Sequence, residues 1–210
     1  LMTVRVKKEE DGVSRFLGSL HGEALARGLP IDLLTCSATA EEGPHLRVLR
    51  PYCEFRLEGH QDQPIRLPSL IDAHRLFAEG GYDRVISSTE LPMGAVALYF
   101  KYAFHVPAGL YMHTDWVDFA RKTLRFDDGL LARGQELMRL YYGRFDGIFV
   151  LNREHERWLT GEGMALPPAR VRRTAHWADP YFTPQPDRRR ELLGVEPDRP
   201  VLLFAGRLSE

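Results

Sequence analysis

The chain has 210 residues, of which 44% are hydrophobic and 27% are charged, and its formal net charge is −1. This composition is ordinary for a folded protein, and the near-zero charge excludes a broad basic surface for nucleic acid. No run of about 18 apolar residues is present, so a membrane-spanning helix is not expected. The two cysteines, Cys36 and Cys53, fit no metal-binding spacing. We therefore expect a cytoplasmic protein.

The first predicted elements are a strand over residues 3–6, a helix from Val13 to about Gly28, and a buried strand over residues 31–36. The helix is indicated by apolar residues that recur from Val13 onward at helical spacing. Gly12 stands between the first strand and this helix, where a glycine allows a ligand to approach the backbone closely. The helix start can also face an anion. An ordinary tight turn accounts for the same glycine, and both interpretations stay open.

Strands and helices continue to alternate along most of the chain. Residues 37–67 are less regular, with short strand-like pieces near 46–49 and 53–57. After them we expect helices over residues 70–80, 92–104, 130–144 and 153–161, and strands over 84–87, 106–112, 147–151 and 171–174. Short apolar strands between helices predict an α/β fold, a Rossmann-like parallel sheet with helices on both faces.

Polar residues follow several of these strands directly. Glu90 follows one, the triplet His113, Thr114 and Asp115 follows the next, and Asn152 follows a third. Ligands of open α/β sheets bind beyond the carboxyl ends of the strands, so these residues are candidates for substrate binding. An imidazole there can hydrogen-bond a hydroxyl or a developing charge. Polar residues also end strands and cap helices, which is the plainer explanation of each one taken alone.

Aromatic residues come directly after the His113 triplet. Trp116 and Phe119 have side chains that can form a wall against a sugar ring, and packing at the start of a helix explains them equally well. Basic residues follow at Arg121, Lys122 and Arg125. Such a face permits peripheral contact with a membrane, and a plain amphipathic helix is the alternative.

The C-terminal part changes character. Four prolines between residues 184 and 200 flank a short charged segment and indicate a linker. Residues 201–205 (VLLFA) have the pattern of a buried strand. We expect one domain over residues 1–197, and over 198–210 a linker with the first strand of a second, truncated domain. Such a strand has unpaired edges, so pairing of two copies into a homo-oligomer stays open.

Several of these pieces occur in the order found in retaining GT-B glycosyltransferases of family four, and the chain resembles the N-terminal, acceptor-side domain of that family. The two most specific pieces contain His113-Thr114-Asp115 and Arg207. The matching pieces are residues 11–15 (DGVSR), 90–94 (ELPMG), 113–116 (HTDW), 150–152 (VLN), 178–184 (ADPYFTP) and 204–209 (FAGRLS).

The resemblance implies transfer of a sugar from a nucleotide-diphospho-sugar to a sugar, lipid or other hydroxyl acceptor, with retained configuration. It implies that Gly12 and Val13 lie near the donor phosphate and the acceptor. His113 would hydrogen-bond the transferred sugar at the reacting centre. Arg207 would bind the donor pyrophosphate, so that no metal or other cofactor is expected.

One motif departs from the family. The loop usually written GVD reads HWAD at residues 176–179. The donor-side motifs are expected beyond Glu210, so we expect the 210-residue chain to be inactive by itself. A nucleotide-sugar epimerase of the same fold and a noncatalytic sugar- or nucleotide-binding module remain the alternatives.

Overall fold

The computed structural model describes residues 1–4, 12–56, 64–122, 125–175, 194, 196, 199 and 200. The chain divides into two compact units, Leu1–Trp177 and Ala178–Glu210, and the helices and strands named below belong to the first unit. The expected domain boundary near residue 197 and the expected strand over residues 201–205 lie outside the described residues.

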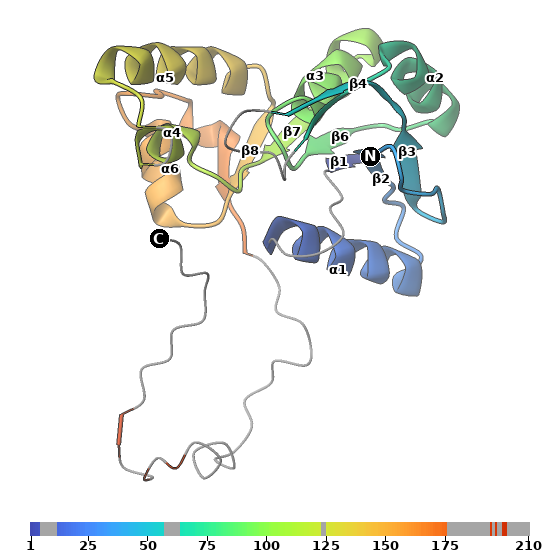
Figure 1. Cartoon of the computed structure of the whole chain (residues 1–210), viewed down its shortest axis with the longest axis horizontal. Coiled ribbons are helices and arrows are strands. Elements are labelled where there is room, and N and C mark those ends of the chain that lie inside the picture. Colours follow the sequence, from blue (N-terminus) through green and yellow to red (C-terminus); the bar gives the residue numbers. More distant parts are fainter. Residues whose placement is uncertain are drawn as a thin grey trace. The chain divides into compact units, whose positions relative to one another are not determined.

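A parallel sheet forms the centre of the first unit (Figure 1). In the described chain it has seven strands, and every neighbouring pair is parallel. The strand order reverses between β1 and β6, because the chain first moves outward to β3 and then crosses to the other side of β1. The prediction of a Rossmann-like parallel sheet is confirmed. In spatial order the strands are β3 (Leu46–Leu49), β2 (Leu33–Cys36), β1 (Met2–Val4), β6 (Val85–Ser87), β7 (Ala108–Tyr111), β8 (Gly147–Val150) and β9 (Val171–Arg173).

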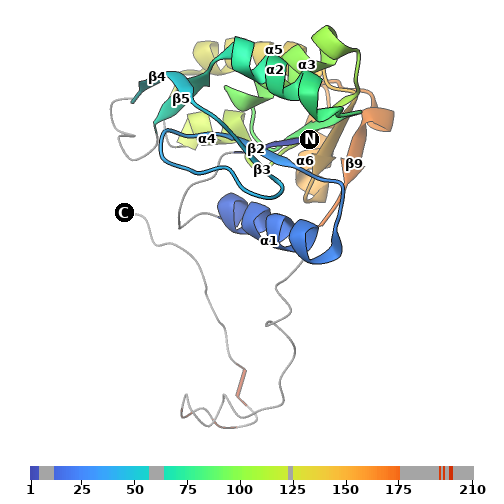
Figure 2. The ribbon, with the colours of Figure 1, turned by 90° about the vertical axis from the view of Figure 1, so that its right-hand side faces the viewer.

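Helices cover both faces of this sheet. Figures 1 and 2 show α1 on one side and α2 and α3 on the other. The helices of the described chain are α1 (Gly12–Arg27), α2 (Leu70–Gly80), α3 (Met93–Phe104), α4 (Trp116–Lys122), α5 (Asp128–Tyr142) and α6 (Arg153–Thr160), and a 3-10 turn (Pro168–Arg170) precedes β9.

Two hydrophobic clusters hold the layers together. On the α1 face, Phe16 and Leu17 pack with Leu33 and Tyr111. On the opposite face a larger cluster joins α2, α3, α5 and α6 to the sheet. Its largest fully buried side chains include Phe100 and Tyr142. In β2, β7 and β8, neighbouring residues serve opposite clusters, as the two-residue repeat of a strand requires.

Helix starts are fixed by side-chain caps. The Ser69 hydroxyl accepts a hydrogen bond from the Asp72 amide at 3.3 Å, and Asp127 accepts one from the Leu130 amide at 3.0 Å. These bonds satisfy amide groups that the first helical turn leaves without an internal partner. At the other end, α2 stops at Gly81, whose φ of 62° is the left-handed conformation that glycine adopts most easily.

The region that the sequence predicts to be less regular is ordered where the structure describes it. Its piece at residues 46–49 is β3 of the main sheet, and β4 (Pro51–Phe55) pairs antiparallel with β5 (Ile65–Pro68) in a separate hairpin. The expectation missed β5 altogether. The physical reason is that β5 has only four residues and one buried side chain, so its pattern is too short to indicate a strand.

None of the helices in the described part of the chain has both the length and the hydrophobicity needed to cross a membrane.

Candidate functional site

The candidate site lies at the carboxyl edge of the sheet, by which we mean the carboxyl ends of β1, β6, β7 and β8 with the described connections and helix starts that follow them. Because these four strands are parallel and adjacent, their carboxyl ends lie side by side. Gly12, Glu90, His113 and Asn152 belong to these connections or to the helix starts after them. The sheet thus brings together elements that are far apart in the sequence.

His113 lies against an aromatic surface. Its ring stacks on Tyr111 with the centroids 4.6 Å apart, and the Phe16 ring meets it edge-on at 5.8 Å. Phe16 and Tyr111 also contact each other, with centroids 5.2 Å apart. Both ring nitrogens of His113 are shielded from solvent. The aromatic neighbours fix the plane of the imidazole and lower the local polarity, which strengthens any hydrogen bond that the ring makes.

The start of α1 lies beside this aromatic surface. Gly12 is the first residue of the helix, and Val13 packs on the cluster that contains Phe16 and Tyr111. The first turn of α1 is therefore near His113. Residues 5–11, including Asp11, lie outside the described residues.

Glu90 lies below the edge and not open to it. Only 9% of this residue is exposed, and its Oε1 accepts a hydrogen bond from the Tyr142 hydroxyl at 2.9 Å. Burial raises the pKa of Glu90, and hydrogen bonds from the Trp116 indole and Tyr142 lower it in part. The Tyr141 hydroxyl donates to the Glu90 carbonyl at 2.5 Å. Glu90 therefore ties the connection after β6 to the end of α5 and the start of α4.

The rest of the triplet and the aromatic residue after it form the start of α4. Asp115 Oδ1 accepts a hydrogen bond from the Asp118 amide at 2.9 Å, so it caps this helix. Thr114 is half-buried between His113 and the cap. Trp116 is 40% exposed, and its ring meets Phe119 edge-on at 5.5 Å. Trp116 is thus partly exposed while its indole N–H is used by Glu90.

Asn152 caps α6. Its Oδ1 accepts a hydrogen bond from the His155 amide at 2.7 Å, and the residue itself is exposed. The structure places it at the same carboxyl edge as the other candidates, two connections along from β6. Arg207, which is predicted to bind the donor pyrophosphate, lies outside the described residues.

Four residues that sequence reasoning missed belong to this edge. Phe16 and Tyr111 hold the His113 ring, and Tyr141 and Tyr142 hold Glu90. The helical spacing predicts that Phe16 is buried, and the tyrosine pair ends a predicted helix, but neither pattern indicates its partner in space. Among the described residues, no three His, Cys, Asp or Glu side chains gather in a way that could hold a metal ion.

The close packing around Gly94 leaves no room for a side chain at this position. A Cβ at this position would lie 2.5 Å from the Thr89 carbonyl oxygen and 2.6 Å from the Tyr141 hydroxyl. Any side chain here would therefore push the connection after β6 away from α5.

Two comparisons with known proteins bear on this arrangement. A family model described as Glycosyltransferase Family 4 matches residues 11–192, which is most of the chain. The match includes Gly12, Glu90, His113 and Asn152 and ends before Arg207. Among curated proteins, none matches the sequence.

Proposed function

The chain belongs to Glycosyltransferase Family 4, and on that premise we propose that it forms the acceptor side of an enzyme that transfers a sugar from a nucleotide-diphospho-sugar to a hydroxyl acceptor with retained anomeric configuration. The observation that supports this most is the position of His113. It follows β7 at the carboxyl edge, the place where open α/β sheets bind their ligands, and it lies beside the first turn of α1.

The proposed chemistry needs two charges to be stabilised at once. When the bond between the sugar and the diphosphate breaks, the sugar becomes cation-like and the diphosphate carries the negative charge. His113 donates or accepts a hydrogen bond at a hydroxyl of the transferred sugar, with its ring held by Tyr111 and Phe16. Fixed groups of this kind stabilise a transition state because they need no reorganisation during the reaction.

The diphosphate is the proposed partner of the α1 start and of Arg207. The first amide groups of a helix point away from it without internal partners, and they attract an anion. A guanidinium can bind two phosphate oxygens at once. In this proposal these groups balance the leaving charge, and no metal takes part.

Trp116 is proposed to contact the acceptor. The residue is 40% exposed, and its N–H is held by Glu90, so the ring has a fixed orientation. A fixed aromatic face suits the apolar side of a sugar ring. Glu90 acts in this proposal as a positioning residue, because its carboxyl group holds Trp116 and Tyr142 and is not exposed at the edge.

The test is a transfer assay on the native gene product that contains this chain. The protein is mixed with a panel of nucleotide-diphospho-sugars and a panel of hydroxyl acceptors, and release of the nucleoside diphosphate is followed. The proposal predicts release that depends on an acceptor, and a glycoside product whose anomeric configuration matches the donor. A changed sugar still attached to its nucleotide would indicate an epimerase. Binding of nucleotide-sugars without any turnover would indicate a noncatalytic module. The 210-residue chain alone is expected to show no transfer.

A further inference from the structure

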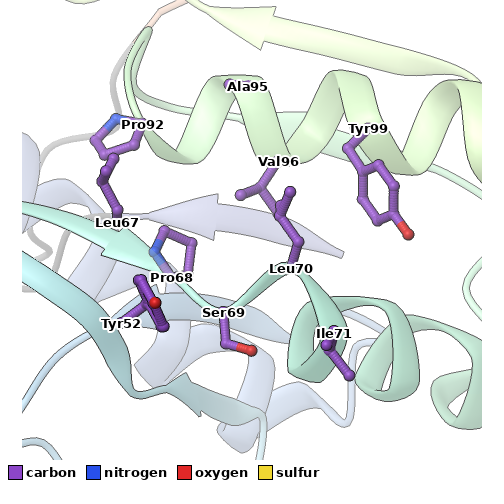
Figure 3. Close-up of a pocket in the computed structure, with 10 residues that line it drawn as sticks. All are labelled: Tyr52, Leu67, Pro68, Ser69, Leu70, Ile71, Pro92, Ala95, Val96 and Tyr99. Atoms are coloured by element: carbon purple, nitrogen blue, oxygen red, sulfur yellow. The ribbon is translucent and has the colours of Figure 1, made fainter.

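An apolar cavity of about 570 Å³ opens beside the carboxyl edge. Figure 3 shows its ten lining residues, which come from the β4–β5 hairpin, the start of α2, Pro92 and the first two turns of α3. The side chains of Leu67, Leu70 and Val96 face the cavity from these three directions. Its volume falls in the range of about 300 to 1,000 Å³ that is typical of sites for small molecules.

The polar side chains of the lining are largely engaged. Tyr52, Ser69 and Tyr99 are the polar members of the ten. Ser69 caps α2, and the Tyr99 hydroxyl forms a hydrogen bond with His74 Nδ1 at 2.7 Å. A sugar ring has several hydroxyl groups, each of which must find a partner when it leaves water. The lining offers too few such partners, so its chemistry fits a hydrocarbon better than a sugar.

Three arginines of the hairpin and of α2 share two carboxylates in the described part of the chain. Arg66 and Arg56 on the hairpin side both pair with Glu54, at 2.6 Å and 3.9 Å, and Arg75 on α2 pairs with Asp72 at 3.9 Å. None of these charged side chains lines the cavity, and none of the ten described lining residues is charged. An uncharged chain matches such a lining better than a phospholipid headgroup does.

The cavity also adjoins the proposed acceptor site. Pro92 lines it and stands two positions after Glu90 in the connection that follows β6. The residue between them, Leu91, is 70% exposed. The hairpin likewise begins directly after the carboxyl end of β3. An acceptor that places its hydroxyl at the carboxyl edge can therefore extend along Leu91 into the cavity.

From these observations we infer that the cavity binds the alkyl chain of the acceptor, so that the acceptor is a hydroxyl compound with a hydrocarbon tail. That the bound compound is the acceptor rests on the proposed function. The affinity of the cavity for an alkyl chain can be measured without it. Filling the cavity would cover Ile71 and Tyr52, which are 74% and 85% exposed.

The experiment measures binding and not transfer. The 210-residue chain is titrated with methyl, hexyl, heptyl and octyl β-D-glucoside below their micelle-forming concentrations, and methyl-group NMR signals are followed. Burial of each methylene contributes about 0.8 kcal/mol, so each added carbon from hexyl to octyl should tighten binding about fourfold. The methyl signals of Leu67, Leu70, Ile71 and Val96 should move, and methyl glucoside should leave them unchanged.

A matched pair of variants locates the probe. Ala95 is an exposed residue of α3 that lines the cavity, and Ala103 is an exposed residue of the same helix that does not. Ala95→Glu places a carboxylate in the path of the alkyl chain and should weaken octyl glucoside binding about tenfold or more. A glutamate near a helix start is well tolerated, so this variant should fold. Ala103→Glu should bind like the unchanged protein.

Equal affinity for methyl and octyl glucoside would overturn the inference, and so would octyl glucoside binding that Ala95→Glu does not weaken. Neither result would affect the transfer assay. Conversely, alkyl binding with no acceptor-dependent transfer would refute the proposed function and leave the cavity as a site for hydrocarbon chains.

Discussion

Replacement of Gly94 by alanine tests whether the connection after β6 is packed as tightly as the structure shows. The new Cβ would lie 2.5 Å from the Thr89 carbonyl oxygen and 2.6 Å from the Tyr141 hydroxyl, whereas ordinary contacts begin at 3.4 Å. The backbone oxygen would therefore have to move by about 3.4 − 2.5 = 0.9 Å. That displacement would be passed to Glu90, because Tyr141 also donates a hydrogen bond to the Glu90 carbonyl.

The cost follows from two opposing effects. Overpacking of a well-packed interior costs about 1–3 kcal/mol, and an alanine gains about 0.5–1 kcal/mol over a glycine within a helix. We therefore expect Gly94→Ala to lower the free energy of unfolding by about 1–2 kcal/mol. Gly22→Ala is the matched control, because Gly22 lies in α1 and no atom stands within 4 Å of the position that its Cβ would take. This control should keep or slightly raise the stability.

Urea unfolding followed by circular dichroism measures both changes. A second substitution sharpens the test, since Tyr141→Phe removes one of the two atoms that the new Cβ would meet. Alone it should cost about 1 kcal/mol for the lost hydrogen bond. Together with Gly94→Ala it should cost less than the sum of the single changes. The close packing around Gly94 would be contradicted if Gly94→Ala were as stable as the unchanged protein. It would also be contradicted if the stability losses of Gly94→Ala and Tyr141→Phe simply added in the double variant.

Three further predictions concern stability. Burial raises the pKa of Glu90 above 4.5. The contribution of this carboxyl group to the stability of the fold is therefore present at low pH and is lost as the pH rises through the raised pKa. Glu90→Gln should therefore gain stability relative to the unchanged protein as the pH rises above 4.5 in urea titrations, and a difference that is constant with pH would count against this. For Asp32, burial acts to raise the pKa, but hydrogen bonds, first that from Tyr82, outweigh it and hold the pKa below 3.8. The stabilisation by the Asp32 carboxylate is present above pH 3.8 and is lost as the pH falls through the lowered pKa. Asp32→Asn should therefore lower the free energy of unfolding by about 1–2 kcal/mol at neutral pH and by less in acid. Ser69→Ala removes the cap of α2 and should cost about 1 kcal/mol in thermal unfolding, and an unchanged Tm would contradict the cap.

The sheet and the position of the candidate site were predictable because they depend on local patterns. Apolar residues at helical spacing mark α1 from Val13, and short apolar runs mark β2, β7 and β8. Once parallel strands are expected, their following residues must share one edge, so the proximity of Glu90, His113 and Asn152 follows without further information.

The contacts within the site were not predictable in this way. Phe16 and Tyr111 are separated by most of the domain in sequence, and their meeting at His113 depends on which strands become neighbours. Tyr142 reaches Glu90 from a helix 52 positions away. Such pairs are selected by packing of whole elements, and no local pattern encodes them. The same holds for β5, whose partner strand lies across the hairpin and whose side chains mostly lack a buried face.

The most direct test of the account is the effect of removing the His113 side chain on transfer by the native gene product. His113→Ala is compared with His21→Ala, whose ring on α1 bonds only the Pro44 carbonyl in the described structure, at 2.8 Å. The kcat/KM of acceptor-dependent nucleoside diphosphate release is measured for each. Loss of one preorganised hydrogen bond at the reacting centre predicts a fall of about 10²–10³-fold for His113→Ala, with little change for His21→Ala. Equal activity of the two variants would contradict the assignment of the carboxyl edge as the site of transfer.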